Sequence, residues 1–255
     1  MSKLLENKFA LITGSSRGIG AAVAARLAAG GASVIVNYAS SARRAEEVVE
    51  TIRAAGGEAQ AVGADLASME GVRTLIASID GAFGGRFGGR LDILVNNAGT
   101  VEYGPFLEQS DQSYDNHFNL NVRAPIALAK EAGKRMAKTG WGRIINVGSA
   151  FGEAAPMGGV TLYIATKFAL HGFTRALSRE LGPFGVTVNG VQPGPIDTEL
   201  SPDEGTDAHA SMVRLTSVGR FGKVNEIAAA VAYLASPEAS FTNGENLTVD
   251  GGWNA

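Results

Sequence analysis

Short apolar runs alternate with longer alanine-rich or amphipathic stretches along the whole chain. Runs rich in β-branched side chains predict strands at 9–13, 33–38, 59–66, 91–97, 143–149, 186–194 and 245–252. The stretches between them predict helices, among them 18–31, 42–57, one ending near residue 80, about 160–181 and about 224–235. Strands that are apolar on both faces and alternate with helices are typical of a parallel sheet built from right-handed βαβ units.

This alternation continues through all 255 residues without a linker or a block of like charge. We therefore expect one α/β domain, residues 1–255, with a doubly wound parallel sheet covered by helices. In such sheets ligands bind beyond the carboxyl ends of the strands, near the point where the strand order reverses. Motifs that directly follow a strand are therefore the candidates for function.

The first predicted strand runs into the sequence TGSSRGIG at 13–20. Glycines at 14, 18 and 20 allow a tight turn, bring backbone amides close to a pyrophosphate, and let the next helix point its amino terminus at the phosphates. A glycine turn with no chemical role is the alternative. The position between the first strand and an alanine-rich helix favours a dinucleotide site.

The end of the second strand indicates which dinucleotide binds. A carboxylate at this place normally holds the adenosine ribose, and it would repel the 2′-phosphate of NADP. This chain has Asn37-Tyr38 followed by ASSARR at 39–44, with no acid. Charge-assisted hydrogen bonds to a 2′-phosphate could come instead from Arg17, Ser40, Ser41 and Arg43 or Arg44. We expect NADP(H) rather than NAD(H), with at least one of the two neighbouring arginines only solvated.

A phenol and an ammonium group follow the fifth predicted strand. Tyr163 and Lys167 are four positions apart, which places them on one face of a helix. A tyrosine titrates near pH ~10, and a nearby cation stabilises its phenolate. This pair alone occurs by chance in many helices. Ser149 at the end of that strand, and Asn121 in the helical region before it, are placed to reach the same cleft.

Taken together, these motifs resemble those of the short-chain dehydrogenase/reductase family, and the resemblance covers essentially the whole chain. The matching segments are TGSSRGIG at 13–20, Ala64-Asp65-Leu66, NNAG at 96–99, FNLNV at 118–122, Ser149, YIATK at 163–167, QPGPIDT at 192–198 and LTVDGGW at 247–253. The resemblance implies a Rossmann-type sheet of seven parallel strands in the order 3-2-1-4-5-6-7. It also implies an oxidoreductase that transfers the pro-S hydride between a nicotinamide and a carbonyl or alcohol.

The resemblance implies a role for each catalytic residue. Tyr163 is the acid in carbonyl reduction and the base in alcohol oxidation, and Lys167 lowers its pKa and binds the nicotinamide ribose. Ser149 steadies the substrate oxygen, and Asn121 holds a water that links Lys167 to solvent. One acid, one donor beside it and a cofactor hydride are sufficient for this reaction.

The expected cofactor site lies mainly in residues 1–125, and the catalytic and substrate-binding part mainly in 121–220. By resemblance Asp65 contacts the adenine, Asn97 and Gly99 the adenosine-side ribose region, and Ile196 and Thr198 the carboxamide. The full predicted set for NADP(H) is Gly14, Ser16, Arg17, Gly18, Ile19, Gly20, Asn37, Tyr38, Ser40, Arg43, Asp65, Leu66, Asn97, Ala98, Gly99, Tyr163, Lys167, Pro193, Gly194, Ile196 and Thr198.

Two departures from the family pattern concern the substrate. Ser149 and Tyr163 are 14 positions apart, one more than is common, so we expect a one-residue bulge within 153–162. The 3-oxoacyl-carrier-protein reductases typically present arginines to their acidic carrier where this chain has Gly140 and Phe184, although Lys138 and Arg143 lie close by in sequence. This departure weakens the case for a carrier-bound substrate, which stays the alternative to a small molecule.

The substrate pocket is expected to be modest and apolar. Its predicted residues are Ala150, Phe151, Met157 and Tyr103. The short polar segment 199–217 is expected to be a mobile lid. A small ketone, aldehyde or sugar-like carbonyl fits such a pocket better than a steroid or a long chain.

Composition restricts the remaining possibilities. The chain has no cysteine, a formal charge of −3, and no apolar run of the ~20 residues that a membrane span requires. We expect a cytoplasmic protein that binds neither membrane nor nucleic acid, uses no metal, and by family resemblance forms a homotetramer. The three histidines, His117, His171 and His209, show no metal spacing, so we expect them at the surface or at a subunit interface.

The repeat FGGRFGGR at 83–90 suggests an RNA-binding segment when read in isolation. It precedes a strand, and segments that enter strands lie opposite the cofactor cleft. We therefore expect a lengthened turn with Arg86 and Arg90 in solvent. A nucleic-acid-binding protein and an NADP-binding sensor without catalysis remain as alternative functions. Tyr163 and Lys167 are both retained, which argues against the sensor.

Overall fold

The computed structural model describes residues 3–155, 157–199 and 201–255. Within these residues seven strands form one parallel sheet in the order β3-β2-β1-β4-β5-β6-β7, which confirms the predicted topology. The strands are β1 Phe9–Ile12, β2 Ser33–Tyr38, β3 Glu58–Gly63, β4 Ile93–Asn96, β5 Gly142–Val147, β6 Val186–Pro193 and β7 Asn246–Val249. Strand order reverses between β1 and β4, where a ligand is expected.

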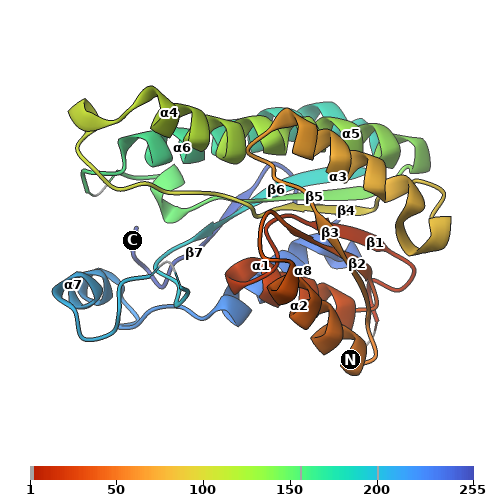
Figure 1. The fold of residues 1–255 in the computed structure, drawn as a ribbon, viewed down its shortest axis with the longest axis horizontal. Coiled ribbons are helices and arrows are strands. Elements are labelled where there is room, and N and C mark those ends of the chain that lie inside the picture. The colour runs from red at the N-terminus through yellow and green to blue at the C-terminus, as the bar shows by residue number, and fades with distance from the viewer. Residues whose placement is uncertain (1–2, 156, 200) are drawn as a thin grey trace.

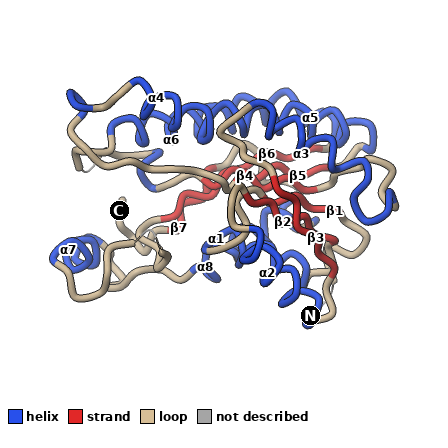
Figure 2. The backbone as a smooth tube through the Cα atoms, in the orientation of Figure 1, coloured by secondary structure: helices blue, strands red, loops and turns tan. Residues whose placement is uncertain are grey.

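Helices cover both faces of the sheet. Figure 1 shows α3, α4, α5 and α6 in one layer and α1, α2 and α8 in the other, with the strands between them, as Figure 2 also shows. The helices are α1 Gly18–Ala29, α2 Ala42–Ala54, α3 Met69–Gly81, α4 Asp111–Phe118, α5 Ala124–Thr139, α6 Thr161–Leu181, α7 Asp207–Leu215 and α8 Val224–Ala235. No helix in the described part of the chain is long and apolar enough to span a membrane.

The apolar strands fill two separate cores. In β1, Phe9 and Leu11 pack into the core on one face, whereas Ala10 and Ile12 pack into the core on the other. Successive side chains of a strand point to opposite faces, so an uninterrupted apolar run supplies both cores. This is the reason why the strands could be found from their apolar runs alone.

The repeat at 83–90 lies between α3 and β4, as predicted, but its arginines are not simply in solvent. Arg86 donates to Ser33 Oγ at 2.7 Å and pairs with Glu58, at the start of β2 and β3. Arg90 pairs with the buried Asp92 at 3.0 Å, and its guanidinium also donates to a backbone carbonyl. Arg86 is exposed and Arg90 partly exposed, as predicted, but the prediction did not include these bonds, which tie the turn to the amino-terminal edge of the sheet.

The phenylalanines of the repeat also have a structural role. Phe87 stacks on Phe9 with ring centroids 5.0 Å apart, and Phe83 meets Phe9 edge to face at 5.5 Å. The guanidinium carbons of Arg86 and Arg90 lie 4.7 and 5.3 Å from the centre of the Phe87 ring. The segment therefore closes the end of one core with an aromatic cluster covered by cations.

Candidate active site

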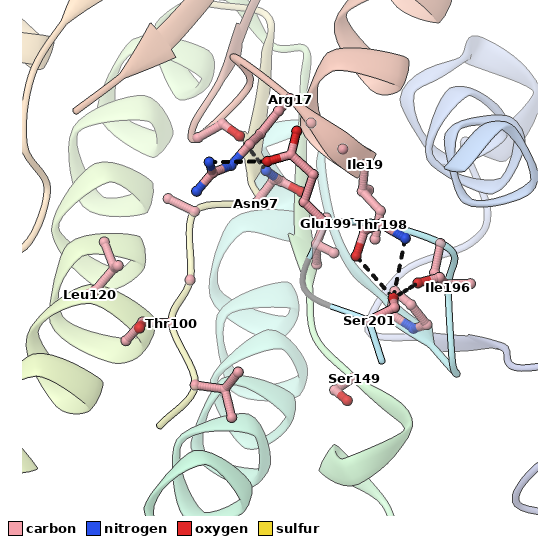
Figure 3. A pocket seen from close by; sticks show the side chains of 18 of the residues that line it. Arg17, Ile19, Asn97, Thr100, Leu120, Ser149, Ile196, Thr198, Glu199 and Ser201 are labelled. Atoms are coloured by element: carbon pink, nitrogen blue, oxygen red, sulfur yellow. Dashed lines mark hydrogen bonds and ion pairs between the residues drawn. The ribbon is translucent and has the colours of Figure 1, made fainter. Parts of the chain in front are cut away.

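A cavity of about 530 Å³ opens at the carboxyl ends of the strands, a size typical of small-molecule sites. All of the predicted cofactor residues except Arg43 line it, and so do Ser149, Ala150, Phe151 and Tyr103. Figure 3 shows Arg17, Asn97, Ser149 and Ile196 around this space, from four different loops. Residues far apart in sequence are thus brought together as the topology requires.

The glycine loop forms a close-fitting cradle. Gly14 has a φ of +59°, and a Cβ there would lie 2.9 Å from the Cα of Ala98. A Cβ on Gly20 would lie 2.5 Å from Nδ2 of Asn97. The backbone amides of Asn97 and Ala98 donate to Thr13 Oγ1 at 2.9 and 3.0 Å. Only glycine fits at positions 14 and 20, and this allows the glycine loop to pack directly against the NNAG segment. The floor of the cavity is therefore formed by backbone, as a pyrophosphate site requires.

Asn37 supports this loop from the end of β2. Its side chain is buried, its Oδ1 accepts from the amide of Gly14 at 3.1 Å, and its Nδ2 donates to the carbonyl of Ala64 at 3.1 Å. The amide therefore connects the glycine loop to the chain beyond β3. It also leaves the ribose end without a carboxylate at the position where NAD-binding sites carry one.

The two neighbouring arginines point in different directions. Arg43 pairs with Glu47, one helical turn away, and its side chain is 80% exposed. Arg44 pairs with Glu199 at 2.7 Å, on the rim that Arg17 also reaches. Arg44 is thus linked to the cavity through Glu199, which lines it, whereas Arg43 pairs along its own helix. The sequence contained the signal for the pair of Arg43 with Glu47, because two residues four positions apart lie on the same face of a helix.

Lys167 is almost completely buried, on α6. Its Nζ donates to the carbonyl of Val147 at 3.1 Å and lies 5.4 Å from the centre of the Tyr163 ring. Burial lowers the pKa of Lys167 from 10.5 to about 8, because the charged form loses its hydration. A Cβ on Gly99 would lie 3.7 Å from this Nζ, so the ammonium group borders the cavity where the NNAG segment leaves β4.

Tyr163 lies one turn before Lys167 on the same face of α6. Burial raises the pKa of the Tyr163 phenol to about 12; a hydrogen bond with Ser149 opposes this shift, and the nearby Tyr103 adds to it. Ser149 is itself fixed, because its amide donates to Gln192 Oε1 at 2.7 Å and its Oγ accepts from the amide of Phe151 at 3.2 Å. The phenol is therefore protonated at neutral pH and hydrogen-bonded to a fixed hydroxyl.

Asn121 lies behind this pair, in a π-helical turn at Asn119–Arg123 that joins α4 to α5. Its Nδ2 donates to the carbonyl of Thr100 and to Thr166 Oγ1, at 2.9 and 3.1 Å, and its Oδ1 accepts from the amide of Thr100 at 2.9 Å. Asn121 does not line the cavity. It connects the NNAG loop to α6, the helix that carries Tyr163 and Lys167.

Comparison with known proteins agrees with this geometry. A family model described as Enoyl-(Acyl carrier protein) reductase matches residues 14–254. The 3-oxoacyl-[acyl-carrier-protein] reductase FabG of Pseudomonas aeruginosa is 38% identical over 248 residues, which cover 97% of this chain and 98% of that protein. A short chain dehydrogenase from Burkholderia cenocepacia, solved in complex with NADP, is 43% identical with a TM-score of 0.90, over 98% of this chain and 99% of that one. The chain belongs to the short-chain dehydrogenase/reductase family.

A second solved structure carries the same kind of cofactor. A blue fluorescent protein from a metagenomic library, in complex with NADPH, is 41% identical with a TM-score of 0.90, over 98% of this chain and 99% of that one. Short-chain dehydrogenases/reductases are oxidoreductases that use a nicotinamide cofactor, and the two solved relatives hold its phosphorylated form. The predicted family and enzyme class are therefore confirmed, and the predicted cofactor is the one that these two relatives hold.

Trp253, which the sequence analysis missed, lies at the substrate end of this dehydrogenase/reductase site. Phe151 meets Tyr163 edge to face at 6.1 Å on one side and Trp253 at 5.1 Å on the other. Trp253 lines the cavity, and the tail that carries it is held by Asn254, whose Nδ2 donates to the carbonyl of Ala150 at 2.9 Å. The motif LTVDGGW was the available signal, but it was used only to recognise the family.

Met157 is not among the residues that line the cavity, and 41% of it is exposed. The expected bulge falls partly on Pro156, which lies outside the described residues. Around this position the backbone amide of Gly104 donates to the carbonyl of Gly159 at 2.9 Å, so the two loops beside Tyr163 support one another. The segment expected to be a lid contains the helix α7, and its Met212 reaches the cavity.

The prediction that His117 lies at the surface or an interface was wrong. The side chain is fully buried, its Nε2 accepts from the amide of Glu102 at 3.1 Å, and its Nδ1 lies 2.8 Å from the carbonyl of Ser113. The ring is therefore neutral, with the proton on Nδ1, and it holds the loop that carries Tyr103. No cluster of His, Cys, Asp and Glu among the described residues could hold a metal ion.

Proposed function

We propose that this protein is an NADP(H)-dependent oxidoreductase that interconverts a small ketone or aldehyde and its alcohol by tyrosine acid–base catalysis. The observation that carries the proposal is the convergence of Tyr163, Ser149 and Lys167 on one wall of a cavity whose floor is the glycine cradle. When bound, the nicotinamide supplies a hydride to the carbonyl carbon, or accepts one from the alcohol.

The side chains of the site donate the proton and stabilise the negative charge that forms during the reaction. Tyr163 is protonated at neutral pH, because its pKa is raised to about 12, and its hydroxyl can give that proton to the carbonyl oxygen. Ser149 is held where its hydroxyl can donate to the same oxygen, so the growing negative charge has two donors. The ammonium of Lys167 stabilises the phenolate that remains until a proton from solvent restores the phenol.

Coenzyme choice follows from the charge at the adenosine end. Arg17, Arg44 and the hydroxyls of Ser40 and Ser41 lie on the rim where the ribose 2′-position would be, and Asn37 replaces the usual carboxylate. Cationic and hydroxyl donors favour a 2′-phosphate. We therefore propose NADP(H) over NAD(H) for this chain.

The closest competing proposal is a 3-oxoacyl-carrier-protein reductase, the activity that names the relative from Pseudomonas aeruginosa. The positions where such enzymes present arginines carry Gly140 and the exposed Phe184 here. Arg143 does not replace them, because its guanidinium is buried and donates to the carbonyls of Gly142 and Ser236. The two arginines that would bind an acidic carrier are thus replaced here, and although Lys138 is exposed near Gly140, their loss favours a free small molecule.

The decisive test combines coenzyme oxidation with a single variant. Purified protein is assayed with NADPH and NADH against ketones, aldehydes, sugars, and the same 3-oxoacyl group on a small thiol or on a carrier protein. We expect turnover with NADPH and small carbonyls, no gain from the carrier, and a loss of about 100-fold or more in kcat/KM for Tyr163→Phe. This variant should still bind NADPH, because the rest of the predicted cofactor set is intact.

Two other results would assign a different function. Wild-type protein that binds NADPH but reduces none of the carbonyls would be the non-catalytic sensor. A preference for the carrier-bound thioester would make it a carrier-protein reductase. We also propose that the protein acts in the cytoplasm as a homotetramer, in line with the family resemblance and with the apolar side chains that the single chain leaves exposed.

A further inference from the structure

An acidic side chain lies between the two arginines that NADP would need. Glu199 follows β6, and its carboxylate pairs with Arg44 Nη1 at 2.7 Å and with Arg17 Nη1 at 3.4 Å. The second carboxylate oxygen lies 2.9 Å from the same Nη1 of Arg44. Figure 3 shows the carboxylate of Glu199 next to the guanidinium of Arg17, joined to it by a dashed line. One anion thus connects the glycine loop, the start of α2 and the chain beyond β6.

Glu199 lies at the start of the segment that covers the substrate end. The amide of Thr198 donates to Ser201 Oγ at 3.2 Å, and Ser201 Oγ donates to the carbonyl of Ile196 at 2.5 Å, so Glu199 belongs to a compact turn. Ile196 and Thr198 line the cavity, and Met212 of α7 reaches it further along. The ion pairs of Glu199 therefore fasten this turn to the adenosine end of the site.

We propose that Glu199 competes with the coenzyme 2′-phosphate for Arg17 and Arg44, and that a bound 2′-phosphate releases the segment that follows Glu199. This inference rests on the proposed use of NADP(H). Carboxylate and phosphate both bind guanidinium groups through paired oxygens, so the two anions require the same donors. They also repel each other, so both cannot be held at the same arginines without a loss of affinity.

The ionised state of Glu199 and the exposure of the three side chains suit an exchange of the carboxylate for a phosphate. The hydrogen bond and charge of Arg44 lower the pKa of Glu199, so its carboxylate is ionised at neutral pH. The side chains of Arg17, Arg44 and Glu199 are 53%, 39% and 57% exposed, and ion pairs this exposed are weak. A phosphate carries more charge than a carboxylate, so it can displace Glu199 at a modest cost in affinity.

The test uses two nucleotides that occupy only the adenosine end, 2′,5′-ADP and 5′-AMP, with calorimetric titration of the whole protein. We expect Glu199→Gln to bind 2′,5′-ADP about two- to fivefold more tightly and to bind 5′-AMP as wild type does. Glu47→Gln is the matched control, because Glu47 lies on the same rim but pairs with Arg43. It should change neither affinity appreciably. In an Arg44→Ala background, Glu199→Gln should have a smaller effect.

The release of the segment has its own readout. In wild type, 2′,5′-ADP should increase amide hydrogen exchange in 201–215, and 5′-AMP, which has no 2′-phosphate, should not. Neither nucleotide reaches Ile196 or Thr198, so the increase cannot come from direct contact with this turn. In Glu199→Gln the exchange should already be high without nucleotide. Equal tightening by the Glu47 and Glu199 variants, or a change in 5′-AMP binding that matches that of 2′,5′-ADP, would overturn the proposal.

Failure of this inference is distinguishable from failure of the proposed function. Neither titration requires turnover, so a wild type that prefers 2′,5′-ADP but responds to neither variant leaves NADP(H) use intact and removes the role of Glu199. If wild type does not prefer 2′,5′-ADP over 5′-AMP, the proposed coenzyme choice is wrong, and the competition falls with it.

Discussion

Lys167 shows how a single residue can serve the reaction at the expense of the fold. Its ammonium is almost completely buried, and burial alone lowers its pKa from 10.5 to about 8. Below pH ~8 the folded protein therefore holds a charge that water would stabilise better, at a cost of about 3 kcal/mol. The proposed proton transfer needs a cation next to Tyr163, and under that proposal this requirement explains why a lysine is kept in the core.

The change Lys167→Met tests this cost. Methionine is unbranched like lysine and one atom shorter; it removes the buried charge and also the bond to Val147, worth roughly 1 kcal/mol. We expect the free energy of unfolding at pH 7 to rise by about 1–3 kcal/mol while turnover is lost. The measurement is urea unfolding without coenzyme.

The pH dependence provides the control. Between about pH 8 and 10.5 the unfolded chain binds more protons at Lys167 than the folded one, so wild-type stability should gain from this group as pH rises. That gain should be missing in Lys167→Met. Parallel curves for the two proteins across this window would show that Lys167 is not destabilised by burial.

At the scale of single elements, the repeat at 83–90 closes the end of one hydrophobic core and is not a binding site. Phe87 lies between Phe9 and the guanidinium groups of Arg86 and Arg90, at the sheet edge opposite the cavity. We expect Phe87→Ala to lower the free energy of unfolding by about 2–3 kcal/mol and to leave kcat/KM within about twofold of wild type. Leu107→Ala is the control, because Leu107 is 94% exposed and its loss should not affect stability.

The elements also show what a sequence can predict. Strands were located because an apolar run is a local signal, and the glycine, NNAG and Tyr–Lys motifs were placed because each follows such a strand. The π-helical turn at Asn119–Arg123 was not predicted, since it is maintained by bonds from Asn121 to Thr100 and Thr166, 21 and 45 positions away. The burial of His117 and the position of Trp253 depend on contacts of the same long-range kind.

At the scale of the whole molecule, four of the apolar side chains that remain exposed belong to two different parts of the fold. Ile126 of α5 and Phe168 of α6 are 39% and 46% exposed on the helical layer above the sheet in Figure 1. Tyr233 of α8 and Phe241, in the loop before β7, are 45% and 103% exposed. Two different apolar faces on one chain are what a homotetramer with two kinds of twofold contact requires.

This arrangement predicts which assemblies appear when each face is changed. Light scattering on wild type should give about four times the chain mass of 26.3 kDa. Phe168→Glu and Phe241→Glu should each leave dimers, because each charge disrupts one contact and spares the other, and the double variant should be a monomer. Leu107→Glu, on an exposed side chain that belongs to neither pair, should remain a tetramer. If wild type has the mass of one chain, the proposed assembly is wrong. If either single variant gives monomers directly, the two faces do not form independent contacts.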